Sequence, residues 1–301
     1  MQPRASLTRF ALLSVVAAVV TILLKGAAWG LTGPVRPLSD APGSFVNPAR
    51  ALMALAMLAL AARPADADHA FGHGKAEYFS SGLEGGLILV AAATIAWAAV
   101  GRLLSPQPLE QVGLGLAVSV VASLVNLGTA AVLMRAGRQH ESITLRANAH
   151  HLMTDVWTSA GVIAGVAAVA VTGWLWLDPL LALAVAANIV WTGVGIVRSS
   201  VDGLMDRSLP DHELAKLRAV LDRHTGPHVR YHALRTRQSG RRRFVDLHVL
   251  VPPTWSVGQG HQLLELIEAD LRAALPNTSV FTHLEPLGDP AALNDLDLDR
   301  D

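Results

Sequence analysis

The segment 147-ANAHHLMTDVWTSAG-161 places a histidine and an aspartate inside an apolar stretch that extends to residue 173. A stretch of this kind predicts a helix that crosses a bilayer, because a span needs about 20 apolar residues. His151 and Asp155 are four residues apart, so their side chains share one helix face at a separation of roughly 6 Å. An ionisable group at bilayer depth is costly, and the pair therefore predicts a functional site. A hydrogen-bonded pair that only joins two helices is the alternative.

The composition also indicates a membrane protein. Of the 301 residues, 51% are hydrophobic and 16% are charged, and the mean hydropathy is +0.39. Soluble domains carry about 25% charged residues. Hydropathy predicts a transmembrane domain over residues 1–206, with spans at 8–32, 41–62, 79–104, 112–134, 147–173 and 175–198. Basic residues of the short loops fall mostly on one side, so we expect a multi-pass protein of the cell inner membrane with both termini in the cytoplasm.

The charge and cysteine counts exclude other classes. Lys and Arg total 24 and Asp and Glu total 24. The chain therefore lacks the excess of basic residues that is expected of a nucleic-acid binder. The chain has no cysteine, so metal ligation falls to His, Asp, Glu and Asn.

A smaller domain is predicted after the last span, where the hydropathy drops. Residues 207–287 give the order helix, strand, strand, helix, strand, which suits a small α+β sandwich. The predicted elements lie at 210–223, 230–236, 244–251, 259–275 and 279–284. Residues 288–301 are acidic and short of large apolar side chains, so we expect a disordered tail.

A partner for the intramembrane pair is expected from the second span, 39-SDAPGSFVNPAR-50. The carbonyl oxygen of Asn47 could bind a cation, or its amide could make a hydrogen bond between helices. Asp40 is a further candidate, although Ser39-Asp40 ahead of Pro42 is typical of a helix N-cap. Asp40 also lies about 10 Å along the helix axis from Asn47, which makes a shared ion difficult.

Two histidine groups are predicted at the cytoplasmic face. In the loop 63-RPADADHAFGHGKAE-77, Asp66, His69 and His73 can supply three corners of a tetrahedral zinc site. In the soluble domain, histidines and one glutamate lie on or beside predicted elements and indicate a second metal cluster, with scattered surface histidines as the alternative. These residues are His232, His248, His261, His283 and Glu285.

From about residue 8 to 287 the chain resembles the cation diffusion facilitator family of divalent metal/proton antiporters. The resemblance lies in RPADADHAFGHGKAEYFS after span two, HHLMTDVWTSAG in span five, and LMDRSLPD, HALRTRQSGRRRFVDLHV and THLEP in the cytoplasmic part. It implies a membrane all-α six-helix domain, a ferredoxin-like, metallochaperone-like C-terminal α+β domain, and a homodimer joined largely through that domain.

The resemblance also implies roles for individual residues. The family's transport site combines an acidic pair in span two with His-x-x-x-Asp in span five. His151 and Asp155 match the second half, whereas the first half falls on Gly43 and Asn47, so both acidic ligands are missing. The loop and C-terminal groups match the family's other metal sites. Lys75 and Asp206 resemble an interdomain ion pair that couples the membrane and soluble parts.

The expected function is efflux of divalent cations, zinc or else iron, cobalt or manganese, by proton-coupled antiport with alternating access. Such a secondary active transporter is not an enzyme and needs no prosthetic group. Its partners are the lipid bilayer, the metal ion, the proton and a second copy of the chain, with no nucleic acid. The missing acids leave open a non-transporting metal sensor or regulatory partner. A membrane metallohydrolase is a weaker alternative, because no nucleophile or general acid converges at the same depth.

Overall fold

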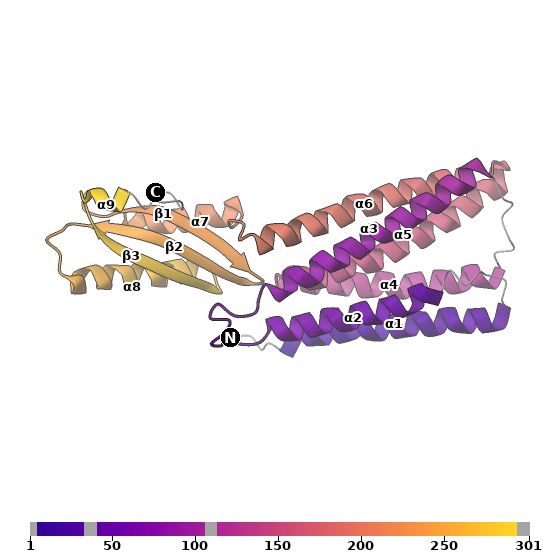
Figure 1. Ribbon diagram of the computed structural model, residues 1–301, viewed down its shortest axis with the longest axis horizontal. Helices are drawn as coiled ribbons and strands as arrows, with labels where there is room; N and C mark the ends of the chain where they lie inside the picture. The colour runs from indigo at the N-terminus through magenta and orange to yellow at the C-terminus, as the bar shows by residue number, and fades with distance from the viewer. Residues whose placement is uncertain (1–4, 33–40, 106–112, 294–301) are drawn as a thin grey trace. The chain divides into compact units, whose positions relative to one another are not determined.

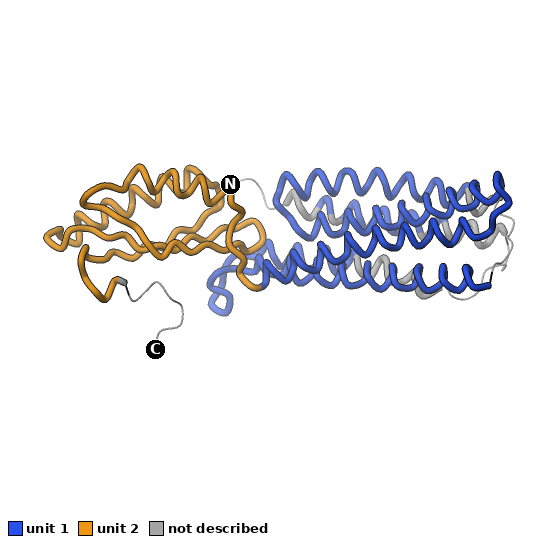
Figure 2. The backbone as a smooth tube through the Cα atoms, turned by 90° about the horizontal axis from the view of Figure 1, so that it is seen from above, with its two compact units in different colours: residues 1–204 blue, residues 205–301 orange. Residues whose placement is uncertain are grey.

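The computed structural model describes residues 5–32, 41–105 and 113–293. The chain divides into two compact units, residues 1–204 and 205–301, which Figure 2 colours separately.

The first unit contains six long helices that lie side by side (Figure 1). They are α1 (Ala5–Thr32), α2 (Ala41–Ala61), α3 (Ala76–Leu104), α4 (Gly113–Gln139), α5 (Ile143–Thr172) and α6 (Leu177–Leu204). Among the described residues, α3, Ala117–Gln139 of α4, α5 and α6 are long and apolar enough to cross a membrane. Shorter apolar stretches occupy Leu12–Thr21 and Ala51–Ala61. The predicted six-helix membrane domain is confirmed.

Small residues let α3 and α6 approach closely. Ser81 and Ser200 share a buried hydrogen bond of 2.7 Å across this interface. At Gly203 an added Cβ would lie 2.3 Å from Cε1 of Tyr78, so the ring of α3 occupies the space of a side chain on α6. Small residues at helix interfaces are typical of membrane proteins, where close packing replaces the hydrophobic effect.

A polar contact fixes the start of α5 against the start of α3. The Ser142 hydroxyl accepts from the backbone N–H of Leu145 and so caps α5. The same hydroxyl donates to the buried carboxylate of Glu77, and the Thr144 hydroxyl donates to the Glu77 carbonyl oxygen at 3.2 Å. The first turn of α5 is thereby held in place, two turns before His151.

The second unit is a three-stranded sheet with two helices packed on one face. Its elements are α7 (Asp211–His224), β1 (Arg230–Ser239), β2 (Arg242–Val251), α8 (Val257–Ala274), β3 (Thr278–Pro286) and α9 (Pro290–Leu293). The strand order is β1-β2-β3, with β2 antiparallel to β1 and parallel to β3. The predicted helix and strand order of this α+β domain is confirmed.

Alternation along β2 decides which face of the sheet is covered. Val245, Leu247 and Val249 are buried in one core with Leu217 of α7 and Leu271 of α8. Successive side chains of a strand point to opposite faces. The side chain of His248 therefore lies on the face opposite to the helices.

The predicted disordered tail starts too early. Residues 290–293 form α9, and Ala292 is buried. The short apolar run Pro-Ala-Ala-Leu packs despite the acidic sequence around it, which composition alone did not reveal. Residues 294–301 lie outside the described part of the chain.

Candidate functional site

The intramembrane pair lies on one face of α5, as its spacing predicts. His151 is buried, and its Nε2 atom is 3.9 Å from Oδ1 of Asp155. The Asp155 side chain is 33% exposed, so the packed helices do not enclose its carboxylate completely. An imidazole nitrogen and a carboxylate oxygen at this separation can bind one divalent ion after small side-chain movements.

A residue of α4 contacts the same carboxylate. Nδ2 of Asn126 donates a hydrogen bond to Oδ2 of Asp155 at 3.4 Å, while Oδ1 of Asp155 faces His151. The two carboxylate oxygens therefore have different neighbours. Asn126 thus links α4 to the polar face of α5 within the apolar helical unit.

The candidate ligands of the second span cannot be placed with this pair. Asp40 lies outside the described residues. Gly43 and Asn47 lie in α2, where the structure describes the backbone from residue 41 but the side chains only from residue 51. Their predicted roles stay predictions.

The loop between α2 and α3 gathers its three predicted ligands. Nδ1 of His69 is 3.2 Å from Oδ1 of Asp66, and Nε2 of His73 is 3.3 Å from Oδ2 of the same carboxylate. The potential ligand atoms of the three residues all lie within 4.8 Å of one another. Two imidazoles and a carboxylate are a donor set that fits zinc.

Hydrogen bonding also extends to lower pH the range in which the loop carboxylate is ionised. The backbone N–H of His69 donates to Oδ1 of Asp66 at 2.8 Å, and this bond is the main reason why the pKa of Asp66 is lowered from its ordinary value of 3.8. The imidazoles of His69 and His73 lower the pKa further. Metal ligation requires the charged carboxylate, so Asp66 is ready to bind a cation at neutral pH.

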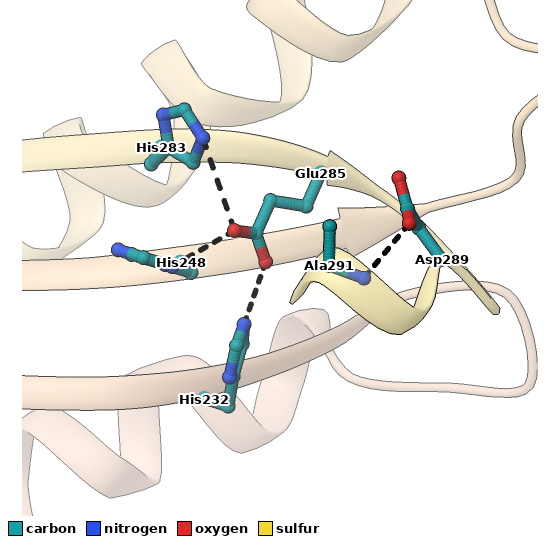
Figure 3. Close-up of polar contacts among 6 residues, drawn as sticks. All are labelled: His232, His248, His283, Glu285, Asp289 and Ala291. Carbon is teal, nitrogen blue, oxygen red and sulfur yellow. Dashed lines mark hydrogen bonds and ion pairs between the residues drawn. The ribbon is translucent and has the colours of Figure 1, made fainter. Parts of the chain in front are cut away.

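Three histidines form a row across the sheet of the second unit. His232 on β1 is paired with His248 on β2, and His248 is paired with His283 on β3. Glu285 follows His283 by two residues, which places it on the same face. Figure 3 shows imidazoles from all three strands directed toward the Glu285 carboxylate.

The distances within this row identify its tightest members. Oε2 of Glu285 is 2.7 Å from Nε2 of His232, and Oε1 is 3.1 Å from Nδ1 of His248. Nε2 of His283 is 3.8 Å from Oε1. The ligand atoms of His232, His248 and Glu285 lie within 4.8 Å of one another and can hold a metal ion together.

A bulge in β1 accompanies this site. The pairing of β1 with β2 shifts between His232 and Arg235, where Ala233 has a left-handed backbone with a φ of 51°. Bulges bend a strand and redirect neighbouring side chains, often beside functional sites. The bulge follows His232 directly.

One predicted ligand lies apart from the sheet cluster, and the predicted interdomain pair is not tested by the contacts described for its two residues. His261 on α8 is exposed and lies 4.0 Å from Glu265, one helical turn away, instead of joining the three-residue group. Nζ of Lys75 donates to the Leu204 carbonyl oxygen at 3.2 Å, and Asp206 is 3.5 Å from Nη1 of Arg237. The Lys75–Asp206 pair, which would join the two units, stays a prediction.

Sequence reasoning missed two polar residues of the helical unit. Asn126 carries no ionisable group, so the rule that singles out ionisable residues at bilayer depth does not select it. Glu84 on α3 is fully buried. The rule that ionisable residues in apolar spans are functional candidates led to His151 and Asp155, and it could have identified Glu84 in the same way.

Comparison with known proteins covers nearly the whole chain. The family model of the cation efflux transmembrane domain matches residues 11–205, and that of the cation efflux protein cytoplasmic domain matches residues 209–287. The uncharacterized transporter sll1263 of Synechocystis is 50% identical over 93% of this chain and 91% of its own. The cation-efflux pump FieF of Serratia proteamaculans is 32% identical over 95% of both chains. The metal-bound C-terminal domain of the CzcD transporter from Thermotoga maritima is 29% identical, covering 27% of this chain and 99% of its own, with a TM-score of 0.25.

Proposed function

The chain belongs to the cation diffusion facilitator family of metal efflux transporters, and from this premise we propose that it exports divalent ions from the cytoplasm in exchange for protons. The expected cargo is zinc, iron, cobalt or manganese. The ion would bind at His151 and Asp155 and leave on the opposite side through alternating access. The observation that carries the proposal is the 3.9 Å approach of Nε2 of His151 to Oδ1 of Asp155 within the helical unit.

Competition between protons and metal would couple the two fluxes. An imidazole binds metal through a neutral nitrogen, and a carboxylate binds it when ionised. A proton on either group therefore opposes metal binding at the same atoms. On the cytoplasmic side the ion displaces protons, and on the opposite side protons displace the ion.

The site would be completed from α2 with less negative charge than in relatives that carry two acids there. Leu58 of α2 packs in one buried cluster with Leu145 and Ala149 of α5. At 1.5 Å per residue, Asn47 lies about 16 Å from Leu58 toward the N-terminus of α2. Asp155 lies about 9 Å from Ala149 and about 15 Å from Leu145 toward the C-terminus of α5. We therefore expect the backbone of Asn47 to lie at about the depth of Asp155. With no carboxylate from Gly43 or Asn47, we expect weaker metal binding or an altered metal preference, with water completing the ligand shell.

The two cytoplasmic clusters would bind the same ions outside the membrane path. Asp66, His69 and His73 lie in the loop that leads into α3, where they would raise the local ion concentration or hold the loop in one conformation. His232, His248 and Glu285, with His283 beside them, would bind metal on the open face of the sheet. We further propose that the cytoplasmic units pair in a homodimer and that both termini lie in the cytoplasm.

Reconstituted vesicles test the transport proposal. Full-length protein in proteoliposomes with an internal metal dye and a pH dye should show metal uptake coupled to proton movement. His151→Ala and Asp155→Ala should abolish most of this flux. His150→Ala is the matched control, because its side chain projects about 100° away around α5.

The outcomes separate transport from sensing. Uptake by Asp155→Ala equal to that of the parent would refute the assignment of the site. A parent that binds metal but moves neither metal nor protons would instead support a sensor or regulatory partner.

A further inference from the structure

We propose that Asn126 of α4 is a ligand of the transported ion through its amide oxygen and that it biases the site toward cations that prefer oxygen ligands. The inference rests on the proposed function, because it adds a residue to the site of His151 and Asp155. Neither the spacing of the sequence nor the resemblance to the family assigned this residue a role.

The orientation of the amide follows from the chemistry of its neighbour. An ionised carboxylate only accepts hydrogen bonds, so the Asn126 group that meets Oδ2 of Asp155 at 3.4 Å is the NH₂ group. The amide oxygen must then point elsewhere. Asn126 is 7% exposed, and within the described part of the chain its Oδ1 atom has no hydrogen-bond partner.

A buried acceptor without a donor is costly to keep, and native proteins rarely keep one without a purpose. Here the unpaired oxygen belongs to a side chain whose other end is fixed to Asp155, the proposed ion ligand. A divalent cation beside that carboxylate would satisfy the amide oxygen. The hydrogen bond from Nδ2 to Asp155 could persist while the ion is bound.

The donor set explains the expected selectivity. Gly43 and Asn47 of α2 stand where the family's acidic pair is expected, and neither supplies a carboxylate. The amide oxygen of Asn126 could partly replace these missing oxygen ligands. Imidazole suits zinc, whereas carboxylate and carbonyl oxygens suit manganese among the transition metals. An amide does not titrate, so it adds affinity for the ion without adding a proton to the exchange.

A purely structural role is the competing explanation, since buried amides also join membrane helices. The same unit offers a matched control for that role. Nδ2 of Asn148 on α5 donates to the Ser14 hydroxyl of α1 at 2.7 Å, and this buried contact does not involve Asp155. Replacement of either asparagine by leucine removes one interhelical amide contact.

The experiment measures manganese and zinc uptake separately in proteoliposomes that contain the full-length parent, Asn126→Leu, Asn126→Asp or Asn148→Leu. Asn126→Leu should lower kcat/KM for Mn²⁺ by about tenfold or more, the range typical of lost supporting groups at metal sites, and should lower the value for Zn²⁺ less. Asn126→Asp should lower KM for Mn²⁺ and make its pH dependence steeper, because the new carboxylate binds protons. Asn148→Leu should change both metals in the same proportion.

An unchanged Mn²⁺-to-Zn²⁺ ratio in Asn126→Leu, or a shift equal to that of Asn148→Leu, would overturn the inference. If Asn126→Leu does not fold, Asn126→Asp decides: an unaltered pH slope and metal ratio would overturn it equally. A parent without flux contradicts the proposed function itself. An active parent with insensitive Asn126 variants contradicts only the role of Asn126.

Discussion

The ion pair between Glu213 of α7 and Arg243 of β2 offers a quantitative test of what holds the cytoplasmic unit together. Oε2 of Glu213 accepts from Nε of Arg243 at 2.8 Å, and Oε1 accepts from Nη2 at 2.6 Å. The two residues are only 9% and 5% exposed. The substitution Glu213→Gln keeps the shape of the side chain but removes its charge and one acceptor.

The expected loss follows from burial. Breaking a buried ion pair from one side costs about 3 to 5 kcal/mol, because the remaining charge stays buried without its counterion. Arg243 also donates to the Pro276 carbonyl oxygen at 3.2 Å, and glutamine retains one acceptor. We therefore expect the lower end, about 3 kcal/mol of unfolding free energy. Since 1.4 kcal/mol corresponds to a factor of ten, core amides of β2 should exchange roughly 100-fold faster.

Hydrogen exchange with mass spectrometry on the full-length protein measures this change in peptides from residues 244–251. The control is Arg272→Gln, which removes a pair one helical turn apart on α8 between the exposed Arg272 and the partly buried Glu268. A pair of this spacing with one exposed side chain contributes about 1 kcal/mol or less. Exchange in Glu213→Gln that matches the parent, or matches Arg272→Gln, would refute the argument from burial.

Three further predictions concern pH, metal binding and helix packing. Hydrogen bonds from Arg243 lower the pKa of Glu213 from its ordinary value of 4.5. The stabilisation of the cytoplasmic unit by this ion pair is therefore fully present above pH 4.5 and is lost as the pH falls through the lower folded-state pKa. Glu213→Gln should flatten this acid dependence in the same exchange experiment. Zn²⁺ at 100 times its Kd should stabilise the cytoplasmic unit by about 2.7 kcal/mol, and Glu285→Gln should reduce this gain; equal protection in both proteins would contradict the sheet site. Gly203→Ala should destabilise α3 against α6 by about 1 to 3 kcal/mol, because its Cβ meets the Tyr78 ring. Gly195→Ala, which meets nothing within 4 Å, is its control, and equal melting temperatures in detergent would count against the packing argument.

Hydropathy and the spacing of residues along the chain were sufficient to predict the helices and strands of the fold. The apolar run that contains His151 and Asp155 predicts a span, and the four-residue spacing places both side chains on one face. Residues 244–251 are predicted as a strand, and the structure confirms it as β2 (Arg242–Val251).

Contacts between different helices or strands could not be predicted from hydropathy and residue spacing. The row of three paired histidines depends on the register of the strands, and β1 reaches that register through a bulge at Ala233. The contact of Asn126 with Asp155 depends on how α4 is rotated against α5, which no period along one helix specifies. Asparagine is also not ionisable, so the rule that identified His151 and Asp155 did not identify Asn126.

The central claim is that His151 and Asp155 hold the travelling ion. Crystals of the full-length protein soaked in Zn²⁺ or Mn²⁺, with anomalous scattering measured at each metal's absorption edge, test this claim directly. We predict an anomalous peak between Nε2 of His151 and the carboxylate of Asp155. Peaks at the loop and sheet clusters with none beside Asp155, under conditions in which the protein transports that metal, would contradict it.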